Sequence, residues 1–192
     1  MNVLLSTTYF GPVQWYQKLY RSDGVIIDSA EVFLKQTYRN RCYIAAANGV
    51  QALTVPVEKA RLTRDVRISN HGDWRRVHWN AIMSAYGESP FFEYYQDDLR
   101  PFFEGHWDYL LDFNEAICET ICDLIDIHPE YISSSDSLTD YRTSINPKHP
   151  VEDITFHPRP YYQVYAHRYG FQPNLSILDL LLNMGPESIF FL

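Results

Sequence analysis

The chain opens with two short apolar runs that flank an amphipathic stretch. Residues 3–8 (VLLSTT) and 25–28 (VIID) predict short buried strands, and residues 13–21 predict a helix that ends at Ser22-Asp23-Gly24. A strand, a helix and a second strand form a βαβ unit, whose two strands run parallel with a right-handed connection. The carboxyl ends of the two strands then share one edge of the sheet, where ligands usually bind in α/β proteins.

A hairpin pattern follows this unit. Residues 41–47 and 51–57 flank Asn48-Gly49, a dipeptide that is typical of two-residue hairpin turns. Apolar and polar residues alternate along 53–57, as expected of a half-buried strand. Pro56 has no backbone N–H to give to a ladder, so this strand is predicted at an edge. One more short strand is expected at residues 65–69.

The middle and the end of the chain are predicted to be helical. Helices are expected from an N-cap at Asp73 to Tyr86, over residues 107–125 and over residues 177–184, where Ser176 and Asp179 have capping-box spacing. Residues 129–160 predict loops around a short strand at 131–133, the place for a lid or binding loop. These elements predict an α/β fold: a single domain over residues 1–192 with a central mixed or largely parallel sheet, a βαβ start, an edge hairpin and packed helices.

Composition narrows the class of protein. The chain has 192 residues, of which 46% are hydrophobic, so it can bury a sizeable core. Its net charge of -8 argues against a general nucleic-acid binder, which needs a basic field. No apolar run reaches the roughly 18 residues of a membrane span. Three cysteines do not make a disulfide framework and suit a reducing compartment. We therefore expect a cytoplasmic protein without nucleic-acid partners or membrane insertion.

Several short motifs occur in order along nearly the whole chain. They are Tyr9-Phe10, the basic stretch 35–41 (KQTYRNR), Pro56-Val57, Trp74 with His78-Trp79, and the closing stretch 175–185. In this order and spacing they resemble the WbqC-like proteins. The chain departs from many members of that family in its first loop, where it has Thr7-Thr8 and Gly11-Pro12 in place of a Gln-Pro and a Pro-Trp pair.

The resemblance implies a biosynthetic context and a class of enzyme, but not one particular reaction. It points to surface-polysaccharide (O-antigen) biosynthesis, with a small acyl or aminoacyl (glycine-type) transferase acting on an amino-sugar intermediate. The expected partner is a small-molecule sugar or acyl donor. The residues indicate neither a cofactor nor an oligomeric state. Two other functions stay open: a non-catalytic carbohydrate- or protein-binding module of a glycan-assembly system, and a nucleotide-binding, nucleotidyltransferase-like enzyme.

His78 and a basic cluster are the first candidates for a site. His78 lies on the inward side of its predicted helix, and an imidazole suits a general base because its ordinary pKa is near 6.5. The alternative is a hydrogen-bonded core histidine. Lys35, Asn40 and Arg41 belong to the basic stretch and predict binding of a phosphate or carboxylate. The alternative is a charged surface beside an edge strand.

Three more residues complete the candidate set. Tyr9 follows the first strand and Asp28 ends the second, so both are expected at the same edge of the sheet. Tyr86 belongs to the central motif of the resemblance. We expect His78 and Asp28 to be catalytic and Tyr9, Lys35, Asn40, Arg41 and Tyr86 to bind substrate.

The remaining polar residues have structural explanations. Asn114 lies on the apolar side of its helix and is expected to tie that helix to a neighbouring loop. Cys118 and Cys122 share a helix face without zinc-site spacing, so packing is their expected role and no metal site is predicted.

Overall fold

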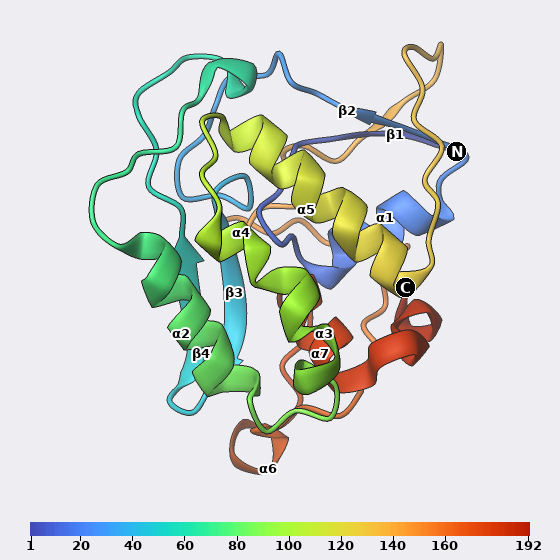
Figure 1. Ribbon diagram of the computed structural model, residues 1–192. Coiled ribbons are helices and arrows are strands. Elements are labelled where there is room, and N and C mark those ends of the chain that lie inside the picture. The colour runs from blue at the N-terminus through green and yellow to red at the C-terminus, as the bar shows by residue number, and fades with distance from the viewer.

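The opening βαβ unit is present, with its two strands side by side (Figure 1). Its first strand is the middle strand of a three-stranded parallel sheet. The computed structural model describes residues 1–192. β1 (Asn2–Leu5) pairs with β2 (Gly24–Ile27), and α1 (Val13–Arg21) connects the two strands. A two-residue strand, β5 (Thr139–Asp140), pairs with the other side of β1. The strand order β2-β1-β5 places the carboxyl end of β1 between its two neighbours.

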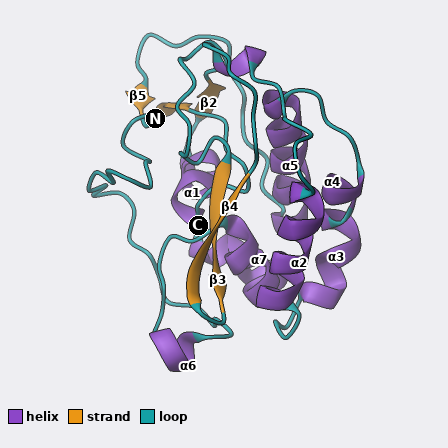
Figure 2. Ribbon diagram, turned by 90° about the vertical axis from the view of Figure 1, so that its left-hand side faces the viewer, coloured by secondary structure: helices purple, strands orange, loops and turns teal.

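The predicted hairpin forms a sheet of its own. β3 (Arg41–Ala46) and β4 (Gly49–Thr54) pair antiparallel and make no ladder with the parallel sheet (Figure 2). The turn consists of Ala47 and Asn48, one residue earlier than the sequence predicts. Gly49 opens β4 with a φ of +108°, a conformation that glycine adopts without strain.

Helices pack around both sheets. Besides α1 they are α2 (Trp74–Tyr86), α3 (Phe92–Leu99), α4 (Pro101–Glu104), α5 (Leu110–Ile125), α6 (Ala166–Tyr169) and α7 (Ile177–Met184), with 3-10 turns η1 (Thr63–Asp65) and η2 (Gly185–Phe191). The sequence predicts α1, α2, α5 and α7 but not α3 or α4. The strands expected at 65–69 and 131–133 are reduced to isolated bridges, such as Val57 with Ile68 and Val25 with Tyr131.

One hydrophobic core joins these elements. A cluster of 41 buried residues runs from Val3 in β1 to Leu192 at the end of the chain. α5 contributes a buried stripe that includes Leu110, Phe113 and Ile117, and its amphipathic pattern follows from this single buried face. The α/β fold class predicted from the sequence is confirmed. None of the helices has the length and apolar character that crossing a membrane requires.

Candidate functional site

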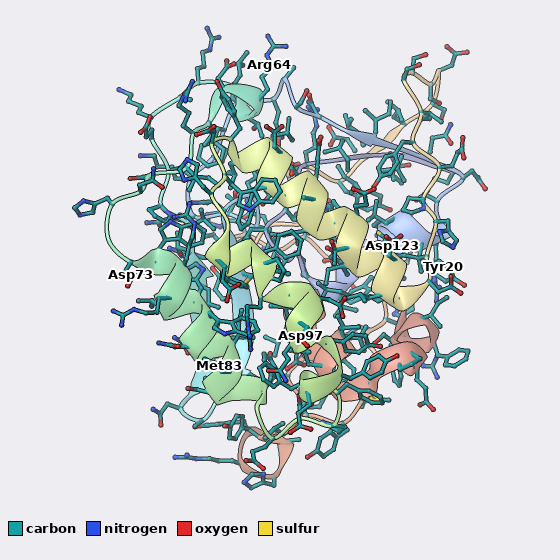
Figure 3. All side chains as sticks on the ribbon, viewed as in Figure 1. Tyr20, Arg64, Asp73, Met83, Asp97 and Asp123 are labelled. Carbon is teal, nitrogen blue, oxygen red and sulfur yellow. The ribbon has the colours of Figure 1, made fainter.

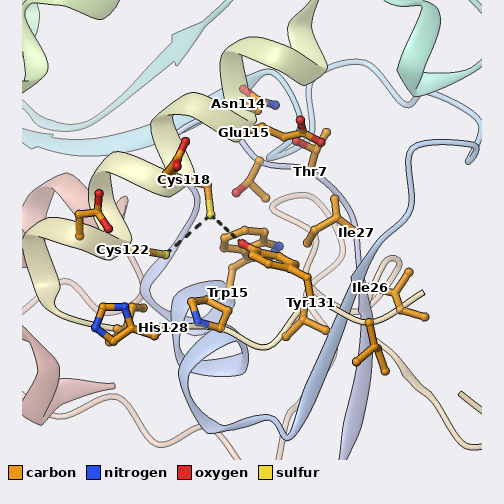
Figure 4. A pocket seen from close by; sticks show the side chains of 17 residues that line it. Thr7, Trp15, Ile26, Ile27, Asn114, Glu115, Cys118, Cys122, His128 and Tyr131 are labelled. Atoms are coloured by element: carbon orange, nitrogen blue, oxygen red, sulfur yellow. Dashed lines mark hydrogen bonds between the residues drawn. The ribbon is translucent and has the colours of Figure 1, made fainter. Parts of the chain in front are cut away.

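A cavity of about 620 Å³ opens between α5 and the parallel sheet (Figure 4). Thr7 and Thr8 follow β1, and Val25, Ile26 and Ile27 belong to β2, so the cavity runs along β2 and reaches the carboxyl ends of the first two strands. This is the edge at which parallel sheets usually bind ligands, and the volume suits a small molecule. α5 supplies the opposite wall with Asn114, Glu115, Cys118, Glu119, Cys122 and Asp123.

Two buried oxygens in the cavity wall have no hydrogen-bond partner. They are Thr8 Oγ1 and Asn114 Oδ1, and their residues are 4% and 1% exposed. Asn114 Nδ2 donates to the backbone carbonyl of Arg39 at 2.8 Å, which confirms the predicted tie between helix and loop and leaves Oδ1 free. Unpaired buried polar atoms are uncommon because each lacks the hydrogen bonds it makes in water. Both atoms are therefore hydrogen-bond acceptors in residues of the cavity wall that the folded chain leaves unused.

The outer part of the α5 wall is acidic. Glu115, Glu119 and Asp123 lie on the exposed side of the helix, and Figure 3 shows Asp123 near its carboxyl end. Partial burial raises the pKa of Glu115, and the nearby carboxylate of Asp112 raises it further. Three carboxylates at one rim favour a cationic group over an anion. The cavity thus combines an acidic rim with buried hydrogen-bonding oxygens and an apolar wall.

Tyr131 and two cysteines line the cavity between these regions (Figure 4). Tyr131 Oη lies 3.8 Å from Cys118 Sγ, which lies 3.9 Å from Cys122 Sγ. Both cysteines are buried and free, as packing residues are expected to be. No group of three or more His, Cys, Asp or Glu side chains is arranged to hold a metal ion.

A buried ion pair fixes the loop that leaves β1. The Arg39 guanidinium donates to Glu31 Oε1 and Oε2, both at 2.7 Å, and to Ser6 Oγ at 2.8 Å. The Arg39 and Glu31 side chains are 5% and 7% exposed. Ser6 directly precedes the two threonines of the cavity wall, so this network holds their backbone in place. We expected Asn40 and Arg41, rather than Arg39, to belong to the site. Arg39 is the cation of residues 35–41 that is buried and forms an ion pair.

His78 lies in the core and not in the cavity wall. It is 4% exposed, and its Nδ1 lies 2.8 Å from Tyr9 Oη. Burial lowers the His78 pKa to about 4. A hydrogen bond with the Thr54 backbone raises the pKa, but by less than burial lowers it. The imidazole is therefore neutral at pH 7, and its partners are the Tyr9 hydroxyl and the Thr54 backbone. A general-base role stays a prediction, and these contacts fit a hydrogen-bonded core histidine.

The basic-stretch candidates make structural contacts around the hairpin. Asn40 donates from Nδ2 to the Val55 carbonyl and accepts from the Gln36 backbone N–H, both at 3.1 Å. Arg41 Nε donates to Thr54 Oγ1 at 2.7 Å across the two strands. Lys35 is exposed to solvent. Anion binding by these residues remains a prediction.

The other two candidates also lie apart from the cavity. Tyr86 Oη donates to Asp179 Oδ1 at 2.9 Å on α7, inside the core. Asp28 is paired with Arg142, which also binds Asp140 at the end of β5. Of the seven candidates only Tyr9 and His78 share a side-chain hydrogen bond, and none of the seven lines the cavity.

Comparison with known proteins agrees with the resemblance noted in the sequence. The profile described as WbqC-like protein family matches residues 7–149. The chain belongs to the WbqC-like protein family. This WbqC-like protein is 27% identical over 202 aligned residues to an uncharacterised protein of Mycobacterium tuberculosis, Rv1507c, with 86% of each chain covered. No solved structure matches the chain.

Two residues of the first loop, Thr7 and Thr8, belong to the cavity wall. The resemblance set the same pair apart in the sequence.

Proposed function

We propose that this WbqC-like protein transfers a small acyl or aminoacyl group to the amine of an amino sugar during assembly of a surface polysaccharide. The cavity at the carboxyl ends of β1 and β2 takes the amino sugar. The single observation that carries the proposal is the pairing of an acidic rim with two buried, unpartnered oxygens in one cavity of about 620 Å³.

Each part of the cavity matches one part of such a substrate. Thr8 Oγ1 and Asn114 Oδ1 accept hydrogen bonds from sugar hydroxyls, which replaces partners that the folded chain lacks. The carboxylates of Glu115, Glu119 and Asp123 attract the ammonium group. A neutral sugar satisfies the first contact alone, so the rim selects for the amine.

The reaction needs an activated acyl donor, for which a thioester is the simplest class. Glu115 accepts a proton from the ammonium and leaves a neutral amine with a free electron pair. The amine nitrogen attacks the carbonyl carbon, an N–C bond forms, and the C–S bond breaks as the sulfur leaves with a proton. The raised pKa of Glu115 brings this carboxyl closer to the working pH of a general base.

The test is turnover of a hexosamine with a series of thioester and aminoacyl-ester donors, followed by mass spectrometry of the N-acylated sugar. Glu115→Gln removes the proton acceptor, so kcat should fall by about 10²–10⁴-fold. Glu93→Gln changes another exposed acid, in the first turn of α3 and outside the cavity, and should leave kcat unchanged.

The outcomes separate the functions that the sequence left open. Acylation of the hexosamine that depends on Glu115 supports the transferase. Binding of the hexosamine without turnover of any donor supports the non-catalytic binding module instead. A chain that binds no hexosamine overturns the proposal for the cavity itself.

A further inference from the structure

α1 buries a polar face that the proposed transferase does not use. Gln14, Gln17 and Lys18 are 7%, 4% and 3% exposed, and none of them lines the cavity. They are covered by Asp153 and Thr155, which belong to the irregular segment 141–165 between β5 and α6. A segment of this length without regular structure is uncommon in a compact domain and is often functional.

Asp153 and Thr155 both bond to side chains of α1, and Asp153 supplies the only charge of the two. Asp153 Oδ2 forms an ion pair with Lys18 Nζ and accepts from Gln14 Nε2 at 3.0 Å. Lys18 Nζ also donates to Thr155 Oγ1 at 2.7 Å, and Gln17 Nε2 donates to the Thr155 carbonyl at 2.9 Å. Lys18 Nζ and Gln14 Nε2 form a cradle for an anion on α1 with Gln17 beside it, and the Asp153 carboxylate fills the cradle.

Apolar burial contributes little to this cover. Val151 and Ile154, which flank Asp153 in the sequence, are 59% and 80% exposed. Phe156, which follows Thr155, packs on the core. The Lys18 and Asp153 side chains are only 3% and 8% exposed, and burying such a pair carries a desolvation cost that apolar residues of similar size avoid. An anionic ligand can therefore take over the contacts that Asp153 makes with Lys18 and Gln14.

A second observation points to a ligand at the same face. Gln17 Oε1 is buried and has no hydrogen-bond partner, so one acceptor of the cradle is left unused by the cover. The ring of Tyr141 lies 4.9 Å from Lys18 Nζ and provides an aromatic wall. Tyr141 directly follows β5, beside the carboxyl end of β1, where the strand order reverses and α/β sheets usually bind ligands.

We propose that Gln14, Gln17 and Lys18 form an anion-binding subsite for a phosphoryl or carboxylate group of a ligand, and that Asp153 occupies it until the ligand displaces it. A hydroxyl beside the anionic group donates to Gln17 Oε1. The intramolecular carboxylate competes with the ligand, so the protein binds anions more weakly than the cradle alone would. The subsite is separate from the acidic cavity, and its existence does not depend on the transferase.

The first test uses inorganic phosphate and acetate as probes, with affinities measured by calorimetry. Asp153→Asn keeps the shape of the side chain and removes the competing charge, so it should bind at least about tenfold tighter than wild type. Lys18→Met in the Asp153→Asn background removes the main cation and should abolish the gain. Tighter binding of phosphate than of acetate identifies a phosphoryl site, and equal binding identifies a carboxylate site.

A milder variant and a wild-type measurement cover the case in which Asp153→Asn does not fold. Thr155→Val removes a hydroxyl that bonds to both members of the pair, changes no charge, and should tighten phosphate binding by a smaller factor. In the wild type, saturating phosphate should speed hydrogen exchange of the backbone N–H groups of residues 151–156. The subsite would be overturned if wild type bound phosphate as tightly as the Asp153 or Thr155 variant and if phosphate left the hydrogen exchange of residues 151–156 unchanged. Hexosamine binding by Lys18→Met reports on the cavity independently.

Discussion

Gly11 and Thr8 lie so close that the loop after β1 accepts no side chain at residue 11. A Cβ built on Gly11 would stand 2.4 Å from Thr8 Oγ1 and 2.9 Å from Thr8 Cβ. Thr8 Oγ1 is one of the two unpartnered oxygens of the cavity. The glycine thus allows the tight loop that places a polar group at the ligand-binding edge of the sheet.

Substitution Gly11→Ala should therefore affect both stability and binding. The added methyl group forces Thr8 or the backbone to move, which costs about 1–3 kcal/mol of unfolding free energy. Urea denaturation measures this cost, and the affinity for a hexosamine should fall in the same variant. In a double-mutant cycle, Thr8→Gly should reduce the cost of Gly11→Ala. Purely additive costs would show that the two residues are not in conflict.

The buried His78 predicts a pH dependence of stability. Its pKa is about 4 in the folded protein, below the ordinary value of 6.5, so the unfolded chain binds more protons between these values. Stability should be fully present above pH 6.5 and fall by about 3 kcal/mol as the pH drops toward 4.

Unfolding free energies from pH 7 to pH 4.5 measure this effect. His78→Gln lacks the titrating group and should show a flatter profile over the same range. The same slope in the variant and in the wild type would contradict the assignment of a neutral, buried imidazole.

The Arg39–Glu31 pair should be among the most sensitive polar contacts of the chain. Glu31→Gln leaves a buried guanidinium without its counter-charge and should lower the unfolding free energy by about 3–5 kcal/mol. Asp73→Asn removes the acidic partner of Arg76, where both side chains are largely exposed, and should cost less than about 1 kcal/mol. Similar losses in the two variants would mean that the buried pair does not organise the loop after β1.

The sequence was most informative where local signals decide the structure. α1 and α7 have the predicted bounds because a Ser-Asp-Gly stop and a Ser176 cap act within a few residues of the helix ends. Ser176 Oγ accepts from the N–H of Leu178, the second residue of the helix, so Ser176 caps the helix without forming a capping box. Asp179, its expected partner, instead accepts from Tyr161 and Gln163, because the helix is buried and tertiary contacts take that carboxylate.

The candidate site was harder to predict because its walls come from distant parts of the chain. The two-residue β5 has no readable pattern, and without it the central position of β1 is not evident. The inward position of His78 followed from helical spacing, but its partner Tyr9 is 69 residues away. Arg39 precedes β3, so no strand alternation indicated that it points inward while Arg41 does not. Thr7, Thr8, Asn114, Cys118 and Cys122 drew attention in the sequence and line the cavity, but none of them was expected to bind substrate.

The central claim is that the cavity at β1, β2 and α5 binds an amino sugar. The most direct measurement is calorimetric titration of a hexosamine and of the matching neutral hexose into wild type, Thr8→Val and Thr63→Val. Thr63 is a matched control because its hydroxyl is also buried and unpartnered but lies outside the cavity. Wild type and Thr63→Val should bind the hexosamine more tightly than the hexose, and Thr8→Val should lose about tenfold in affinity, the equivalent of one hydrogen bond. Equal affinity for the two sugars, or equal loss in both threonine variants, would contradict it.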